Sequence, residues 1–151
     1  MHKIVISDTS CLIILEKIDK IFLLKEIYSE VITTPEIQIE YGKELPEWIK
    51  ILSAKNKSFQ KELETKIDVG ESSAIALGLE TPDCTIILDD LKARKIAESL
   101  HVNFTGTLGI LVKAKQLNLI QSVKPIIKNM QEVGLRFSAE VAEDIIKQAG
   151  E

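Results

Sequence analysis

Short apolar runs that alternate with helical segments constrain this chain most strongly. Residues 3–7, 31–33, 85–88 and 102–105 are rich in Ile, Val, Leu and Thr, and helix-forming segments follow them. Continuous apolar runs of this length are typical of strands that are buried on both faces of a parallel sheet. The pattern therefore predicts one α/β domain over residues 1–151, a three-layer α/β/α sandwich with a mostly parallel central sheet.

Residues that start and stop helices define the expected boundaries. Pro35 suits the first turn of a helix and Gly42 its C-terminal end. Gly70 interrupts the helical pattern, so a small-residue helix is expected over residues 71–79, and Thr107 is expected to cap the helix after it. The other expected helices span residues 12–17, 21–28, 57–66 and 91–100 and two segments within 122–150, which pack on the core. Residues 46–54 are ambiguous but alternate like an edge strand.

Composition excludes several classes of protein. The net charge of −4 gives no overall positive field for nucleic acid, although local basic patches can still bind it. Cys11 and Cys84 lie in apolar runs and are expected to be buried thiols, and the two histidines form no pair with the spacing of zinc ligands. No apolar run reaches the ~20 residues that span a bilayer, and Asp8 interrupts what would be the apolar part of a signal peptide. We therefore expect a cytoplasmic protein.

Acidic residues follow the predicted strands or begin the helices beside them. Asp8 follows the first strand, and Asp89 and Asp90 follow the strand over residues 85–88. Glu71 begins a helix rich in Ser and Ala, whose small side chains allow close packing against a sheet. Because ligands bind at the carboxyl ends of parallel strands, we expect these acids to meet at that edge.

One helix contributes a further pair of acids. Glu36 and Glu40 are four residues apart and share a helix face, on which Glu36 is expected to be solvated. Carboxylates that share a site raise each other's pKa unless a cation compensates them. Mg²⁺ and Mn²⁺ prefer oxygen ligands, so an acidic cluster without histidine or cysteine predicts a Mg²⁺ or Mn²⁺ site.

Each of these acids also has a simpler interpretation. Asp8 is a good helix N-cap, although Thr9 or Ser10 could serve as well. Glu71 in a first helical turn is stabilised by the helix dipole. Of Asp89 and Asp90, we expect one to be a ligand and the other a cap, and position alone favours Asp89 as the ligand.

Neighbouring polar and basic residues have two interpretations as well. Ser10 and Thr107 either cap helices or donate hydrogen bonds to a ligating carboxylate or a phosphate. Lys92, Arg94 and Lys95 follow Asp89 and either contact a substrate backbone or form a solvated helix face.

The order of these motifs resembles that of PIN domains, most closely the PIN-like group that is similar to toxins of toxin–antitoxin pairs. The resemblance covers most of the chain. Its segments are "VISDTS" (5–10), "TPEIQIEY" (34–41), "DVGESSAIALG" (68–78), "TIILDDLKARKIAESL" (85–100), "TGTLGILVKAKQLNLI" (105–120) and "GLRFS" (134–138).

This resemblance implies a Mg²⁺- or Mn²⁺-dependent nuclease that acts on RNA, with Asp8, Glu40, Glu71 and Asp89 as the catalytic, metal-binding quartet. It also implies a homodimer and a cognate antitoxin. Two positions depart from the family pattern. The third acid is Glu71 where Asp is common, and Gly-Thr-Leu-Gly stands after Thr105 where a further acid is common.

Two other functions compete with a nuclease. A PIN-like module can bind nucleic acid or protein without cutting, because a fold does not fix an activity. A phosphotransfer protein on a similar sheet is the third possibility, but "SDTS" lacks the second Asp that a haloacid-dehalogenase-like phosphatase has two residues on, and a receiver would have an acidic pair after the first strand.

Overall fold

The structure is a computed structural model that describes residues 3–151. Five parallel strands form its centre. One of the two histidines, His2, lies outside the described residues. The strands are β1 (Ile4–Ile6), β2 (Glu30–Thr33), β3 (Ile49–Ile51), β4 (Cys84–Ile87) and β5 (Phe104–Thr105). Their order in the sheet is β3-β2-β1-β4-β5, and every pair is parallel. The ambiguous segment is therefore an edge strand, and the sheet is wholly parallel.

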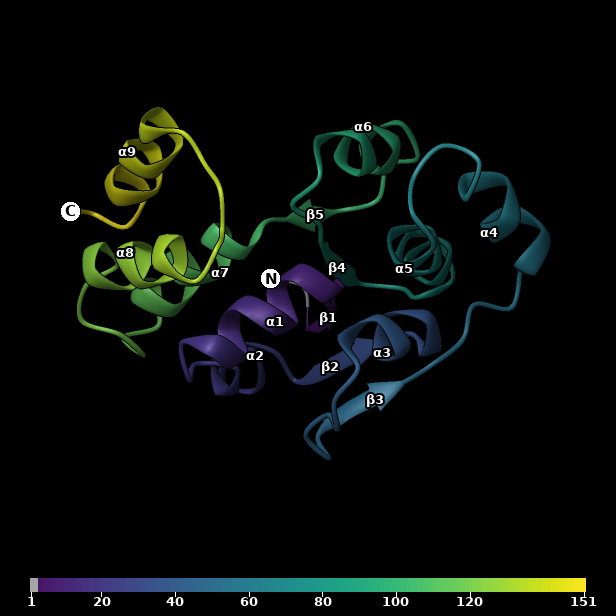
Figure 1. The fold of residues 1–151 in the computed structure, drawn as a ribbon, viewed down its shortest axis with the longest axis horizontal. Coiled ribbons are helices and arrows are strands. Elements are labelled where there is room, and N and C mark those ends of the chain that lie inside the picture. The colour runs from purple at the N-terminus through teal and green to yellow at the C-terminus, as the bar shows by residue number, and fades with distance from the viewer. Residues whose placement is uncertain (1–2) are drawn as a thin grey trace.

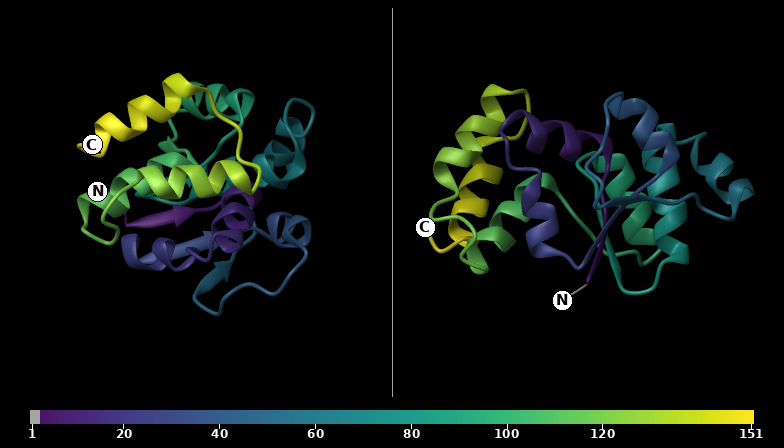
Figure 2. Two further views of the ribbon diagram at one scale, coloured as in Figure 1. Left: turned by 60° about the vertical axis from the view of Figure 1, so that its left-hand side comes forward. Right: turned by 90° about the horizontal axis from the view of Figure 1, so that it is seen from below.

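The expected three-layer architecture is confirmed, with helices on both sides of the sheet (Figures 1 and 2). α3, α4, α5 and α6 lie on one side, and α1, α2, α7, α8 and α9 lie on the other (Figure 1). α5 packs against α3, α4 and β4, whereas α7 packs against α2 and α9. The helices are α1 (Thr9–Lys17), α2 (Phe22–Ile27), α3 (Pro35–Tyr41), α4 (Lys57–Leu63), α5 (Val69–Glu80), α6 (Leu91–Ser99), α7 (Thr107–Gln116), α8 (Lys124–Glu132) and α9 (Ala139–Gln148).

The sheet core is aliphatic, as the scarcity of aromatic residues requires. Val5, Ile6, Ile86 and Ile87 in the central strands are fully buried. Cys11 and Cys84 are buried free thiols, as predicted. No helix within residues 3–151 is both long enough and apolar enough to span a bilayer.

The order of the strands creates a switch point beside β1. From β1 the chain moves outward through β2 and β3, then returns to the other side of β1 to form β4 and β5. Val5 of β1 pairs with Val31 on one side and with Thr85 on the other. The carboxyl ends of β1 and β4 therefore lie next to each other, which is where open parallel sheets bind ligands.

Several expected helix boundaries differ from the structure: α1 begins at Thr9 rather than Leu12, α4 ends at Leu63 rather than Lys66, and two further differences concern residues near the acids. Gly70 does not interrupt α5 but lies in its first turn, after the N-cap Asp68. Thr107 is not the cap of α7, because Gly106 occupies that position and Thr107 is the first helical residue. In both cases the residue makes a tertiary contact with an acidic side chain, which local helix preferences do not reveal.

Candidate active site

Asp8 is held at the junction of β1 and α1. Its carboxylate caps α1 by accepting a hydrogen bond from the Cys11 N–H at 2.9 Å, and the residue is only 5% exposed. Burial is the main cause that raises the pKa of Asp8 well above its ordinary value, followed by repulsion from Asp89 and then from Glu71. A hydrogen bond from the backbone N–H of Asp89 acts in the opposite direction. Asp8 therefore combines the capping role with a place among the other acids.

Asp89 and Asp90 have separate roles at the end of β4. The Asp89 carboxylate accepts two hydrogen bonds from Thr107, from the backbone N–H at 2.9 Å and from the hydroxyl at 2.5 Å. Asp90 is the N-cap of α6 and accepts from the Ala93 N–H at 3.0 Å. Asp90 therefore caps α6 and lies close enough to Glu71 to raise its pKa, whereas Asp89 lies beside Asp8. The choice of Asp89 as the ligand stays a prediction.

Glu71 lies in the first turn of α5, beside an acid that the sequence analysis did not single out. Asp68 caps this helix and accepts a hydrogen bond from the Glu71 N–H at 2.8 Å. Burial, then repulsion from Asp68 and Asp90, raises the pKa of Glu71 to about 8. The signal for Asp68 was present, since Asp at the cap followed three residues later by Glu is a helix-start pattern.

Glu40 reaches the same edge from α3. Its carboxylate accepts a hydrogen bond from the Thr9 hydroxyl at 3.1 Å, and the side chain lies directly against Gly70. A β-carbon at position 70 would overlap with the Glu40 carboxylate, so a larger residue there would displace the end of the Glu40 side chain. Glycine at this position therefore makes room for a candidate site residue.

Glu36 lies outside this cluster, but it is not solvated as expected. Its carboxylate accepts a hydrogen bond from Gln60 at 2.5 Å and pairs with Lys57 at 3.6 Å. The side chain is only 22% exposed because α4 covers this face of α3. The prediction failed because the sequence did not show that α4 would pack there.

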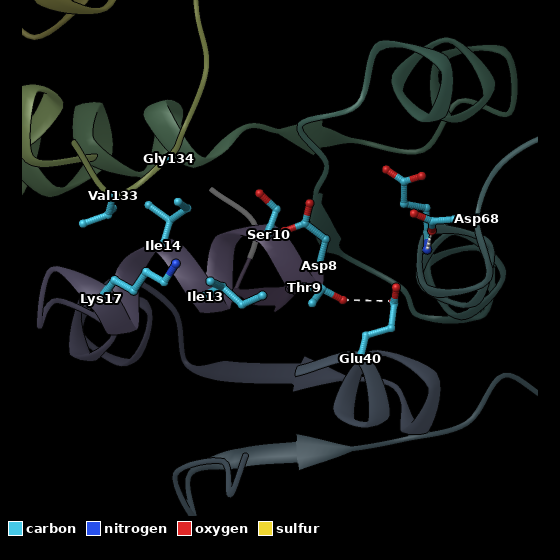
Figure 3. A pocket seen from close by; sticks show the side chains of 11 residues that line it. Asp8, Thr9, Ser10, Ile13, Ile14, Lys17, Glu40, Asp68, Val133 and Gly134 are labelled. Atoms are coloured by element: carbon cyan, nitrogen blue, oxygen red, sulfur yellow. Dashed lines mark hydrogen bonds between the residues drawn. The ribbon is translucent and has the colours of Figure 1, made fainter. Parts of the chain in front are cut away.

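A cavity of about 420 Å³ opens beside these acids. Figure 3 shows Asp8, Glu40 and Asp68 projecting from three different elements around it. Among its lining residues Lys17 is the single base, at the end of α1. Ser10 also lines the cavity, which places it where it can contact a bound ligand. The remaining lining residues are Thr9, Ile13, Ile14, Glu71, Val133 and Gly134.

The acids fit a hard divalent cation by their chemistry, because they supply only oxygen donors and because Asp89 and Glu71 raise the pKa of Asp8. They are not arranged as a ready-made cage. Within residues 3–151, no three acidic, histidine or cysteine side chains are placed so that they could hold one ion together. The hydrogen bonds of Asp89 to Thr107 and of Glu40 to Thr9 direct these carboxylates toward hydroxyl groups. The predicted metal site therefore remains a prediction.

The chain is an α/β domain with acidic residues at the switch point of its parallel sheet, and sequence comparison identifies its family. Residues 4–151 match the model of the family DUF3368, whose description is PIN domain, and the chain belongs to that family. PIN domains are generally nucleases, which indicates a hydrolase that acts on nucleic acid. A search of curated proteins finds no match to the chain.

Proposed function

We propose that the protein is a Mg²⁺- or Mn²⁺-dependent endoribonuclease that hydrolyses RNA phosphodiester bonds with a water nucleophile. The observation that carries this proposal is the convergence of Asp8, Glu71 and Asp89 at the switch point of a parallel sheet. Membership of the PIN family supports it independently.

The chain's own residues have distinct roles in this proposal. Asp8, Glu40, Glu71 and Asp89 would hold one or two ions, while the hydroxyls of Thr107 and Thr9 orient two of these carboxylates. When bound, such an ion activates water and neutralises charge on the attacked phosphate. Lys17, which lines the same cavity, would contact a phosphate of the RNA.

The proposed reaction needs no nucleophilic side chain. The water oxygen bonds to phosphorus, the bond from phosphorus to the 3′ oxygen breaks, and the products carry a 5′-phosphate and a 3′-hydroxyl. Cys11 is unsuited to act as a nucleophile, because burial raises the pKa of its thiol well above the ordinary value.

Further parts of the proposal concern the protein's partners and setting. We propose that this nuclease is the toxin of a toxin–antitoxin pair, acts in the cytoplasm, forms a homodimer and is silenced by a cognate antitoxin. The support is the motif resemblance to toxins described above. A neighbouring reading frame that encodes a small antitoxin-like protein would be the first observation to seek.

A second candidate function is a PIN-like module that binds nucleic acid or protein with weak or no cleavage. The absence of a ready-made metal cage within residues 3–151 favours it. The nuclease and the binding module differ in whether the acidic residues cleave bound RNA.

Cleavage of generic RNA in Mn²⁺ separates the two functions. Native protein is compared with Asp89→Asn and with Asp144→Asn, a matched control at an exposed position of α9. The nuclease proposal predicts that Asp144→Asn cuts like native protein and that Asp89→Asn loses cutting by at least ~10²-fold. Native protein that binds RNA without cutting it would leave the binding module as the better account.

A further inference from the structure

A second cavity, of about 470 Å³, lies on the other side of Asp89. Its walls come from the start of α6, from β5 and α7, from the segment that joins α8 to α9, and from α9 itself. Asp89 lines this cavity, whereas Asp8, Glu40 and Glu71 line the first one. A ligand in the second cavity would therefore lie next to the acidic edge without occupying it.

One wall carries an arginine whose position is fixed by three contacts. The Nε of Arg94 donates to the Leu88 carbonyl at 2.6 Å, and its guanidinium lies over the Phe104 ring at 5.6 Å. An Nη atom of the same guanidinium lies against Gly106, where a β-carbon would overlap with it. A β-carbon at position 106 would also lie 3.1 Å from a carboxylate oxygen of Asp89. Glycine at this position thus leaves room for the Arg94 guanidinium beside Asp89.

The segment between α8 and α9 brings a second cation and a second aromatic ring to the cavity. Leu135, Arg136 and Phe137 of the segment between α8 and α9 all line the cavity. Gly134, with φ +114, turns the chain into this segment. Two apolar side chains of the cavity are strongly exposed, Leu91 at 72% and Val141 at 43%. The cavity thus combines two guanidinium groups, two phenyl rings and an apolar rim.

We propose that this second cavity binds the base of a nucleotide adjoining the scissile phosphate of single-stranded RNA, a proposal that rests on the proposed function. Aromatic rings and guanidinium planes are the groups on which proteins stack unpaired bases, and arginine also contacts phosphate. The net charge of −4 means that attraction for a phosphate backbone must come from local cations such as these.

The cavity's chemistry favours a nucleotide over an apolar side chain of a protein partner. An aliphatic anchor would make no use of the two guanidinium groups, Arg94 beside Asp89 and the exposed Arg136. A nucleotide offers both a flat face for the rings and a phosphate for the cations. The volume of the cavity, about 470 Å³, lies within the range of ligand pockets, ~300–1,000 Å³.

The test measures RNA binding separately from cleavage. A fluorescent single-stranded RNA of about eight nucleotides is titrated into Asp8→Asn protein, alone or combined with Phe137→Ala, Phe137→Trp or Arg136→Gln. Phe22→Ala, at an exposed position of α2, and Lys128→Gln, at an exposed position of α8, are the matched controls. Thermal unfolding shows which variants are folded.

We expect Phe137→Ala to weaken binding by about 5- to 150-fold, the range for loss of one stacked base, and Phe137→Trp to retain it. Arg136→Gln should reduce the slope of log K against log[salt] by about 0.7, the value for one phosphate contact on a single strand. The controls should change neither quantity.

Two outcomes overturn the proposal: RNA affinity within about two-fold of the parent in every pocket variant, or no RNA binding by the parent. An apolar peptide that binds the cavity while RNA does not would point to a protein partner instead. The proposed function fails on a different reading. If native protein does not cut RNA but the pocket variants still lose RNA binding, the proposed base-binding site is supported and the proposed nuclease function is contradicted.

Discussion

Thr107 holds Asp89 by two hydrogen bonds at once, from its backbone N–H at 2.9 Å and from its hydroxyl at 2.5 Å. Thr107 is fully buried and begins α7, whereas Asp89 follows β4. The contact therefore fixes the direction of the Asp89 carboxylate through an element 18 residues further along the chain. Partners of this kind are what orient metal-binding carboxylates in proteins.

Replacing Thr107 by valine tests this orientation, because valine keeps the shape of the side chain but removes the hydroxyl donor. We expect Mn²⁺ affinity or RNA cleavage to fall by about 10- to 100-fold, while Thr107→Ser keeps most of both. Initial rates over a range of Mn²⁺ concentrations provide the measurement. Equal rates for the valine and serine variants would show that the hydroxyl bond has no role.

Substitution of Gly70 by alanine tests the close approach of α3 and α5. The added methyl group overlaps with the Glu40 carboxylate, the end of an exposed and flexible side chain, so we expect Glu40 to move away from its hydrogen bond with Thr9 and the free energy of unfolding to fall by no more than about 1 kcal/mol. Urea denaturation measures it.

The control for this substitution is a double-mutant cycle with Glu40→Ala. Shortening Glu40 removes the overlapping atoms, so Gly70→Ala should no longer lower the free energy of unfolding in that background, because alanine favours a helix more than glycine does. Costs that simply add would show that the strain lies elsewhere than in the contact with Glu40.

The metal-free protein should lose stability as the pH rises from about 4.5 to about 8. The pKa of Glu71 is about 8 in the folded chain, against an ordinary value of 4.5. The folded state therefore binds more protons than the unfolded state in this window, and the free energy of unfolding decreases with rising pH. Asp8, whose pKa is also raised, adds to the effect.

Urea denaturation in EDTA at several pH values measures this dependence. Glu71→Gln should reduce the loss of stability, because glutamine carries no charge at any pH. Stability that is flat or increases over the window would contradict the crowding of these acids.

Lys17 should contribute to substrate binding more than to turnover, since it lines the acidic cavity at the far end from Asp8. We expect Lys17→Gln to raise KM, to leave kcat nearly unchanged and to reduce the salt slope of RNA binding by about 0.7. Lys25→Gln, at an exposed position of α2, is the matched control. A loss confined to kcat would place Lys17 in the chemical step instead.

The sequence was sufficient to predict the layers and the position of Asp8 and Asp89 at one edge of the sheet, because both follow from local patterns. The continuous apolar runs mark β1 and β4 as buried parallel strands, and Asp8 and Asp89 directly follow them. In a parallel sheet such residues necessarily share one edge.

The contacts that tune the site were not predictable, because they join elements whose relative placement depends on packing. The hydroxyl of Thr107 meets Asp89 only once α7 begins beside β4, and Gly70 is explained only by Glu40 on another helix. Glu36 was misjudged for the same reason, since α4 covers it.

The central claim is that the acids at the switch point form a cation site. Thermal unfolding of native and Asp8→Asn protein over a range of Mn²⁺ concentrations tests it most directly. Asparagine also caps helices well, so the variant keeps the start of α1. We predict that Mn²⁺ raises the Tm of native protein, by the equivalent of about 2.7 kcal/mol at a concentration 100 times Kd, and leaves that of Asp8→Asn unchanged. A native Tm that does not respond to Mn²⁺, or an equal rise in both proteins, would contradict the claim.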